Sequence, residues 1–248
     1  AAEDADITYR LYKIFLKSLK SEKLLNIYEI FEKPLIKILA SMEINGIKLD
    51  NNFLKKLSVK FEKKLQDLEK QIFKISKKKF NIASTKQLGE IMYNDLKIAS
   101  LKKTKKGSFA TGAAVLEDLA YKGNEFPKLV LEWRQSSKLK NTYSDSLPEH
   151  LNPNTKRVHT SFLLAATTTG RLASSDPNLQ NIPIKTEEGK DIRKAFISEK
   201  NKKLISADYN QIEMRILADL ADVKELKKAF KNNEDIHSLT ASQVFGAD

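Results

Sequence analysis

The sequence of 248 residues contains no cysteine, so disulfide bonds and thiolate-bound metal sites are excluded. It also lacks any apolar run near the roughly 20 residues of a membrane-spanning helix, and its acidic start, AAEDAD, has no basic signal-peptide region. Charge, by contrast, is plentiful: 44 Lys and Arg stand against 32 Asp and Glu, a formal net charge of +12. This excess favours a polyanionic partner, nucleic acid or an anionic membrane, with a merely lysine-rich soluble protein as the alternative.

Nearly all of the excess charge lies in residues 51–110, which hold sixteen Lys and only five acidic residues. Apolar residues recur there at intervals of three or four, which predicts a long amphipathic helix. The apolar stripe consists of Phe53, Leu57, Phe61, Leu65, Leu68, Ile72 and Ile75. Seven lysines fall mostly off this stripe: Lys55, Lys56, Lys60, Lys63, Lys64, Lys70 and Lys74. They form either an ordinary solvated helix face or the basic side of an arm that follows phosphates.

Three neighbouring segments favour contact with a nucleic-acid backbone. Ser84, Thr85 and Lys86 open a short predicted helix, with Ser84 and Gln87 as its capping box, and the free N–H groups there suit a phosphate. A second predicted helix carries Trp133 on its apolar stripe, so Trp133 is interpreted as core rather than as a base-stacking platform. A polar turn between these helices supplies Lys102, Lys103, Lys105 and Lys106. The end of the second helix supplies Lys138, Lys140, Asn141 and Thr142.

The pattern of the sequence changes after Pro148, where short β-branched runs and turns replace helical spacing. A domain boundary is therefore expected near His150. The predicted elements beyond it are strands at 157–162, 167–172 and 203–208, the last of them buried, a loop at 174–183, and helices at 211–219, 224–232 and 236–245.

Asp208 closes the predicted buried strand and Asn210 opens the following helix, which places a carboxylate at an exposed strand–helix corner. Each residue also has a plainer interpretation. Asp208 suits a turn, and Asn210 with Glu213 matches a structural capping box.

The string DYNQIEMR, residues 208–215, resembles the first catalytic motif of family A DNA polymerases, usually written DYSQIELR. TTGRLASSDPNLQNIP, residues 168–183, is similar to the primer-binding segment that precedes this motif in the family. Further segments that resemble the family in the same order are MEINGIKLD, FNIASTKQLGE, KLKNTYSDSLP, EGKDIRKAF and DIHSLTASQVFG. The resemblance covers essentially the whole chain. It implies an α+β fold with a long helical thumb hairpin and part of a small antiparallel palm sheet flanked by helices. The implied division is 1–33 for the end of a proofreading-exonuclease-like domain, 34–150 for the thumb, and 151–248 for the first part of the palm.

The resemblance also implies roles for the residues at the strand–helix corner around Asp208. Such an enzyme adds deoxynucleotides to a primer 3′ end with two magnesium ions about 4 Å apart. Asp208 would bridge both ions, and the Tyr209 carbonyl would ligate one. Glu213 would exclude ribonucleotides by filling the space beside the sugar 2′ position. Gln211 would support this region, and His237 would approach the triphosphate unless it is simply a surface histidine.

On the DNA side, the resemblance implies that Arg171 reaches the minor groove at the primer end, supported by Asn178 and Gln180. Lys185 stands where the family usually has Arg and would hold phosphate less rigidly. Asp4 matches a metal ligand of the exonuclease and is expected only to cap the first helix. The implied partners are primer-template duplex DNA and deoxynucleoside triphosphates, with no membrane, for a monomeric bacterial cytoplasmic protein at the nucleoid.

The sequence stops before the family's fingers helix and last palm motif, so we expect the 248-residue chain alone to be inactive and to hold no magnesium stably. Three other readings stay open. A non-enzymatic module could bind duplex DNA without sequence preference. A single-subunit RNA polymerase is disfavoured by Glu213, and membrane binding by the lack of aromatic residues along the basic arm.

Overall fold

The computed structural model describes residues 2–98, 109–184 and 186–236, together with 238, 241 and 246. The chain divides into two units, Ala1–Asn201 and Lys202–Asp248. This division lies well after the boundary expected near His150, because a strand from before that point pairs with strands from after it. The assignment of thumb and palm segments stays a prediction.

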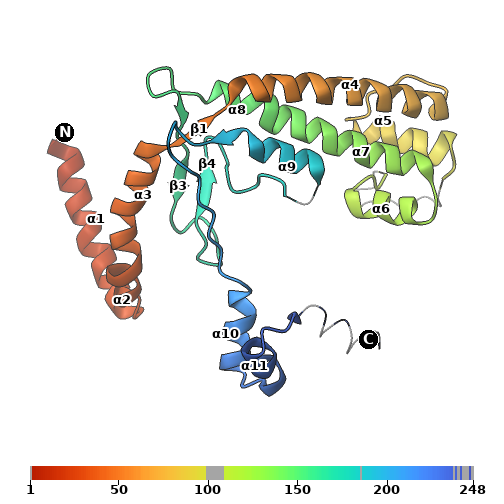
Figure 1. Ribbon diagram of the computed structural model, residues 1–248. Helices are drawn as coiled ribbons and strands as arrows, with labels where there is room; N and C mark the ends of the chain where they lie inside the picture. The colour runs from red at the N-terminus through yellow and green to blue at the C-terminus, as the bar shows by residue number, and fades with distance from the viewer. Residues whose placement is uncertain are drawn as a thin grey trace. The chain divides into compact units, whose positions relative to one another are not determined.

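The first unit begins with four helical segments in which Leu39 is the one buried residue among those described (helices α1 to α3 are labelled in Figure 1). They are α1 (Ala2–Ser21), α2 (Leu25–Ile27), the π-helix η1 (Tyr28–Glu32) and α3 (Lys33–Asn45). The domain boundary expected after residue 33 falls inside a continuous helical segment that runs from α2 through η1 to α3. Gly46 ends α3 with φ +56°, and a Cβ there would lie 2.5 Å from the Val158 carbonyl oxygen, so only glycine fits this junction.

The centre of the first unit is a helical arm made of α4 (Asn51–Ser76) and α7 (Glu125–Leu139), which lie side by side (Figure 1). Asp50 starts α4 by accepting a hydrogen bond from the Phe53 N–H at 2.9 Å. The predicted apolar stripe is buried from Leu57 to Ile72, with Leu54 rather than Phe53 fully buried in the first turn. The arm continues through the π-helix η3 (Lys140–Asp145) into α8 (Ser146–Glu149), and its other end carries α5 (Thr85–Glu90), η2 (Ile91–Asp95) and α6 (Ala113–Tyr121).

Two apolar cores lie along the arm. The core at the α5–α6 end includes Leu68, Ile72, Leu88, Met92, Leu116 and Val130. Trp133 packs against it partly buried, and its indole N–H donates to the Glu69 carboxylate at 3.0 Å, which agrees with a core role. The core at the sheet end includes Leu54, Phe61, Tyr143, Leu147, Val158 and Ile192.

Two small antiparallel sheets complete the first unit and confirm an α+β fold. The first has the order β2 (Arg157–Val158), β1 (Ile47–Leu49), β5 (Phe196–Ile197). The second pairs β3 (Ser161–Leu163) with β4 (Ala173–Ser175), and α9 (Glu187–Lys194) follows them. The predicted strand at 157–162 is therefore divided between two sheets. The strand predicted at 167–172 is wrong, since these residues form the β3–β4 connection, where Thr167 donates to the Arg171 carbonyl at 2.8 Å.

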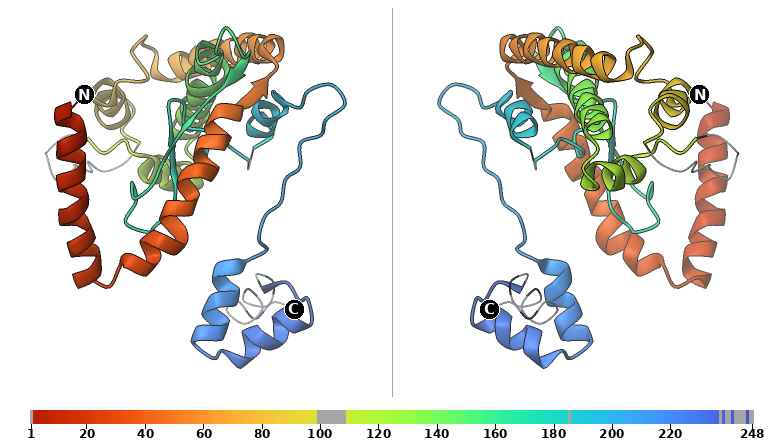
Figure 2. Two further views of the ribbon diagram at one scale, coloured as in Figure 1. Left: turned by 90° about the vertical axis from the view of Figure 1, so that its left-hand side faces the viewer. Right: turned by 90° about the vertical axis from the view of Figure 1, so that its right-hand side faces the viewer.

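The second unit contains α10 (Ile212–Leu220) packed on α11 (Lys224–Lys231) (Figure 2). The buried strand predicted at 203–208 is wrong: these residues are exposed, because no described strand of this unit offers them backbone partners. The residue before α10 is Gln211, with φ +52° and no side-chain capping bond, so Asn210 is not the cap. Most of the helix predicted at 236–245 lies outside the described residues.

Candidate functional site

Two predicted contact segments that are far apart in the sequence meet in one hollow of about 510 Å³, which we call the arm groove. It is lined by Ala83, Thr85, Thr111, Gly112, Trp133, Arg134, Ser137, Lys138, Asn141 and Thr142. The fold therefore brings Thr85 from the start of α5 beside Lys138, Asn141 and Thr142 from the end of α7 and the start of η3. All four side chains are exposed, as a binding surface requires.

The start of α5 is held by side chains. Ser84 is the N-cap and accepts from the Gln87 N–H at 3.4 Å, as predicted. The other half of the predicted capping box is wrong, because the Gln87 carboxamide accepts from the Asn81 N–H at 2.7 Å instead of reaching back to Ser84. Lys86 follows on the exposed side of this turn. The start of α5 is therefore capped by Ser84, and Thr85 of its first turn lines the arm groove.

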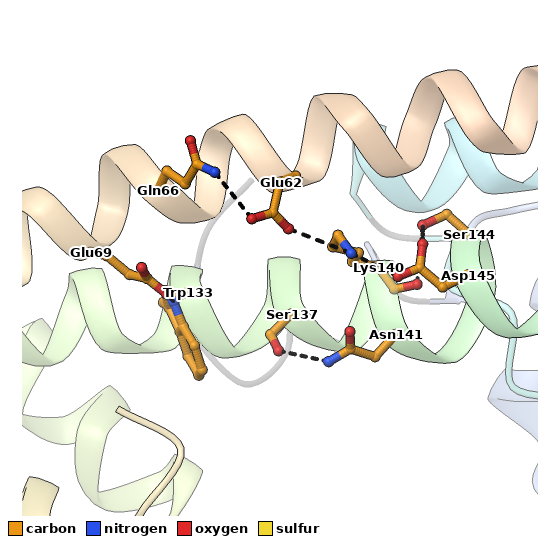
Figure 3. A network of polar contacts seen from close by, with 9 residues as sticks. All are labelled: Glu62, Gln66, Glu69, Trp133, Ser137, Lys140, Asn141, Ser144 and Asp145. Atoms are coloured by element: carbon orange, nitrogen blue, oxygen red, sulfur yellow. Dashed lines mark hydrogen bonds and ion pairs between the residues drawn. The ribbon is translucent and has the colours of Figure 1, made fainter. Parts of the chain in front are cut away.

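The α7 wall of the groove includes Arg134, a residue that the sequence reasoning missed. Its guanidinium donates to the Thr111 carbonyl at 2.7 Å, and burial lowers the pKa of Arg134 from its ordinary value. The signal was present, because Arg134, Lys138 and Asn141 share one helix face at intervals of four and three. Asn141 in turn donates to the Ser137 hydroxyl at 3.1 Å (Figure 3).

Lys140 behaves differently from its neighbours. Its side chain is only 19% exposed, and its amine contacts Asp145 at 2.7 Å and Glu62 at 3.5 Å (Figure 3). The hydrogen bond with Asp145 is the main cause that raises the pKa of Lys140. These ion pairs give Lys140 an internal task, linking α4 to η3, and its expected DNA contact stays a prediction.

The lysines on the basic face of α4 also differ in their contacts. Lys60 contacts Asp191 at 3.1 Å and Lys64 contacts Glu188 at 2.7 Å, so the amines of both lysines meet α9 while their side chains stay 61% and 41% exposed. Lys63, between them in sequence, is exposed. A sequence pattern places charges on a helix face but does not show which of them meet an opposite charge.

The predicted primer-binding residues Arg171, Asn178 and Gln180 lie close to one another. Gln180 donates through its carboxamide to the Leu172 carbonyl at 3.1 Å, next to Arg171. The Gln180 N–H donates to the Asn178 side-chain oxygen at 3.0 Å. These bonds tie the 174–183 loop to the β3–β4 connection, and all three residues are exposed.

Buried hydroxyl groups of Thr160 and Ser174 hold the 174–183 loop by hydrogen bonds. Thr160 lies 2.6 Å from the Ser174 hydroxyl and donates to the Pro177 carbonyl at 2.8 Å. Ser174 accepts from the Leu179 N–H at 3.1 Å. The phenol of Tyr143, in η3, donates to the Asn181 carbonyl, so the arm also holds this loop. The loop is thus built as an ordered element.

In the second unit, Asp208 is exposed in an irregular segment, and Tyr209 is 79% exposed. The corner is held by Arg215, which donates to the Asn210 carbonyl at 2.9 Å while its guanidinium lies 4.4 Å from the Phe230 ring. Glu213 is exposed in the first turn of α10, two residues after Gln211. A carboxylate and a carbonyl are ligands that magnesium accepts, so the donor type fits. Within the described part of the chain, however, no three acidic or imidazole groups converge.

Some predicted residues lie outside those that the structure describes. They are Lys102, Lys103, Lys105, Lys106, Lys185 and His237. Asp4 lies within the first turn of α1 rather than at its cap, where its charge favours the positive end of the helix dipole. None of the helices in the described ranges has the length and apolarity to cross a bilayer.

Comparison with known proteins matches residues 51–248 to DNA polymerase family A. The DNA polymerase I of Rhizobium leguminosarum is 50% identical over 99% of this chain, and that of Pseudomonas aeruginosa is 46% identical over 99%. Among solved structures, the POL domain of Pol1 from M. smegmatis, in complex with DNA primer-template and dNTP, superposes with a TM-score of 0.86 at 38% identity over 94% of this chain and 41% of that one. The chain spans only 24% and 27% of the two bacterial relatives.

Proposed function

We propose, from the premise that this chain belongs to DNA polymerase family A, that it forms part of a DNA-directed DNA polymerase for replication and repair. The full protein would add deoxynucleotides to the 3′ end of a primer paired with a template. The full protein would work as a monomer in the bacterial cytoplasm, at the nucleoid.

The observation that carries this proposal is the arm groove, which gathers Thr85, Lys138, Asn141 and Thr142 within the part of the chain that matches the family. One lysine and several uncharged polar groups suit a phosphate backbone, which they hold without reading the base sequence. Arg171, Asn178 and Gln180 would then orient the primer end, where correct base pairs present minor-groove acceptors. Lys185 would add a phosphate contact beside them.

At the corner, the Asp208 carboxylate and the Tyr209 carbonyl would hold magnesium ions. Bound there, magnesium supplies the positive charge that stabilises the transferring phosphoryl group. Glu213 would exclude a 2′-hydroxyl by its size and by leaving that hydroxyl's hydrogen bonds unmet. Gln211 would support the nucleotide, and His237 would approach its triphosphate.

We propose that the 248-residue chain alone binds duplex DNA but does not extend a primer. Two magnesium ions need several carboxylates, and among the described residues no three acidic or imidazole groups converge around Asp208. Primer extension above a mock purification by this chain would contradict that statement.

The test of the polymerase assignment uses the full-length protein with Asp208→Ala. Extension should fall about a thousandfold or more, since the metal contribution is several kcal/mol. The matched control, Asp219→Ala, removes an exposed carboxylate of α10 that contacts Lys227 at 3.1 Å, and it should leave extension within about twofold. If Asp208→Ala extends primers normally, the catalytic role given to Asp208 is wrong. If the parent protein binds duplex DNA but extends no primer, the non-enzymatic DNA-binding module becomes the better description.

A further inference from the structure

The short helix α9 connects the arm to the loop that carries Asn178 and Gln180. One of its faces presents Glu188 and Asp191, three residues apart, to two lysines of α4 that are four residues apart. Lys64 contacts Glu188 at 2.7 Å, and Lys60 contacts Asp191 at 3.1 Å. The two pairs span more than a hundred residues of sequence and join elements that local pattern alone would not bring together.

The two carboxylates are partly withdrawn from water, with side chains 27% and 21% exposed. The hydrogen bond from Lys64 is the main cause that lowers the pKa of Glu188. Hydrogen bonds from Lys194 first and Lys60 second lower the pKa of Asp191. Both carboxylates are therefore charged at neutral pH. Their partial burial reduces screening by salt, although the Lys60 and Lys64 side chains are 61% and 41% exposed.

The other side of α9 holds the end of the 174–183 loop. Arg193 donates to the Pro183 and Ile182 carbonyls, each at 3.2 Å. Gly189 packs so closely on Pro183 that an added Cβ would lie 2.7 Å from the proline Cβ. A shift of α9 would therefore move the backbone that leads directly from Gln180.

We infer that Lys60 and Lys64 are positioning residues, which act through α9 to fix the shape of the 174–183 loop. They hold α9 by its acidic face, and α9 holds Ile182 and Pro183. A phosphate contact is the plain expectation for lysines on this basic helix, but the amine of each already meets a carboxylate. The effect on primer binding rests on the proposed function, whereas the coupling between α4 and the loop does not.

The test exchanges the two charges of one pair in the full-length protein. Lys64→Glu alone and Glu188→Lys alone should each speed amide hydrogen exchange of residues 178–184 about fivefold, as expected for losing one partly buried ion pair. Each should also weaken primer-template binding about fivefold. The double variant Lys64→Glu with Glu188→Lys restores the pair in reverse and should return both values to within about twofold of the parent.

The matched control is Lys63→Glu with Glu188→Lys, which has the same net charge but places the new carboxylate on an exposed neighbour. It should restore neither value. Restoration by this control would overturn the inference, because general charge would then explain the effect. So would weaker DNA binding in Lys64→Glu with unchanged exchange at 178–184, which would identify Lys64 as a phosphate contact.

Two further measurements keep the result interpretable. Lys64→Arg retains the ion pair, so its exchange rates and primer-template affinity should match those of the parent. If the charge reversal unfolds the arm, Lys64→Met removes the ion pair without adding a repulsion and should change both values in the same direction by a smaller factor. If the parent protein itself binds no primer-template, the proposed function fails, yet the exchange data still decide whether α4 positions the loop.

Discussion

Replacing Thr160 by valine tests whether buried hydroxyls set the shape of the 174–183 loop. Thr160 is buried, and valine has nearly the same shape but no hydroxyl. The change removes the 2.6 Å contact with Ser174 and the bond to the Pro177 carbonyl at 2.8 Å, which the hydroxyl shares with the Ser175 carbonyl at 3.0 Å. Ser174 keeps its bond from the Leu179 N–H, so the loop loses part of its support and not all of it.

The expected size follows from these two bonds. A buried hydrogen bond contributes about 1 kcal/mol, and a polar partner left unpaired adds to the loss, so Thr160→Val should destabilise the closed loop by about 2 kcal/mol. Opening of the loop is then about thirtyfold more frequent, because 1.4 kcal/mol corresponds to tenfold. The rest of the first unit depends on other contacts and should change little.

Hydrogen exchange of peptides from 174–181 measures this opening directly. The rate should rise about thirtyfold in Thr160→Val, while peptides from the buried part of α4 keep theirs. Thr8→Val is the matched control, since it removes an exposed hydroxyl that bonds only to the Asp4 carbonyl within α1. A rise below about threefold, or an equal rise in the control, would refute the role given to these hydroxyls.

Three other predictions follow from the site. Lys138→Gln should lower the slope of log affinity for duplex DNA against log salt by about one, whereas Lys140→Gln should leave the slope unchanged and lower the thermal midpoint, because its charge is used internally. In the full-length protein, Glu213→Ala should raise the ratio of ribonucleotide to deoxynucleotide kcat/KM about a hundredfold, and an unchanged ratio would remove the steric argument. The folded-state pKa of Glu188 is lowered from its ordinary value of 4.5, so the stability that Glu188 contributes is full above pH 4.5 and is lost as pH falls through the lower folded pKa. Circular dichroism melts at pH 6 and at pH 3.5 should show this loss of stability, and Lys64→Met should make the loss smaller.

Local patterns predicted the parts of the fold that depend on local physics. The stripe from Leu57 to Ile72 has helical spacing because that helix buries one face, and the stripe is buried as expected. Ser84 caps α5 because its hydroxyl reaches an N–H only three residues away. These features need no information from distant residues.

The errors arose where distant residues decide the outcome. The run 203–208 has strand-like composition, but a strand also needs partners, and the described second unit provides none. Spacing alone also does not show the ion pairs of Lys140, since Glu62, one of its two partners, lies on another helix. Helix spacing places Arg134 on the same face as Lys138, but it does not reveal the contact of Arg134 with Thr111, which lies in a separate segment.

The close approach of Gly189 to Pro183 also determines which substitutions this region can absorb during evolution. Even a methyl group at position 189 would collide with the proline ring and with its backbone, so a library randomised there should return glycine alone. Lys190, the next residue, is exposed and pairs only with Glu187, and most side chains should be accepted in its place. The tolerance for substitution therefore differs completely between residues 189 and 190, because Gly189 faces the loop and the Lys190 side chain faces water.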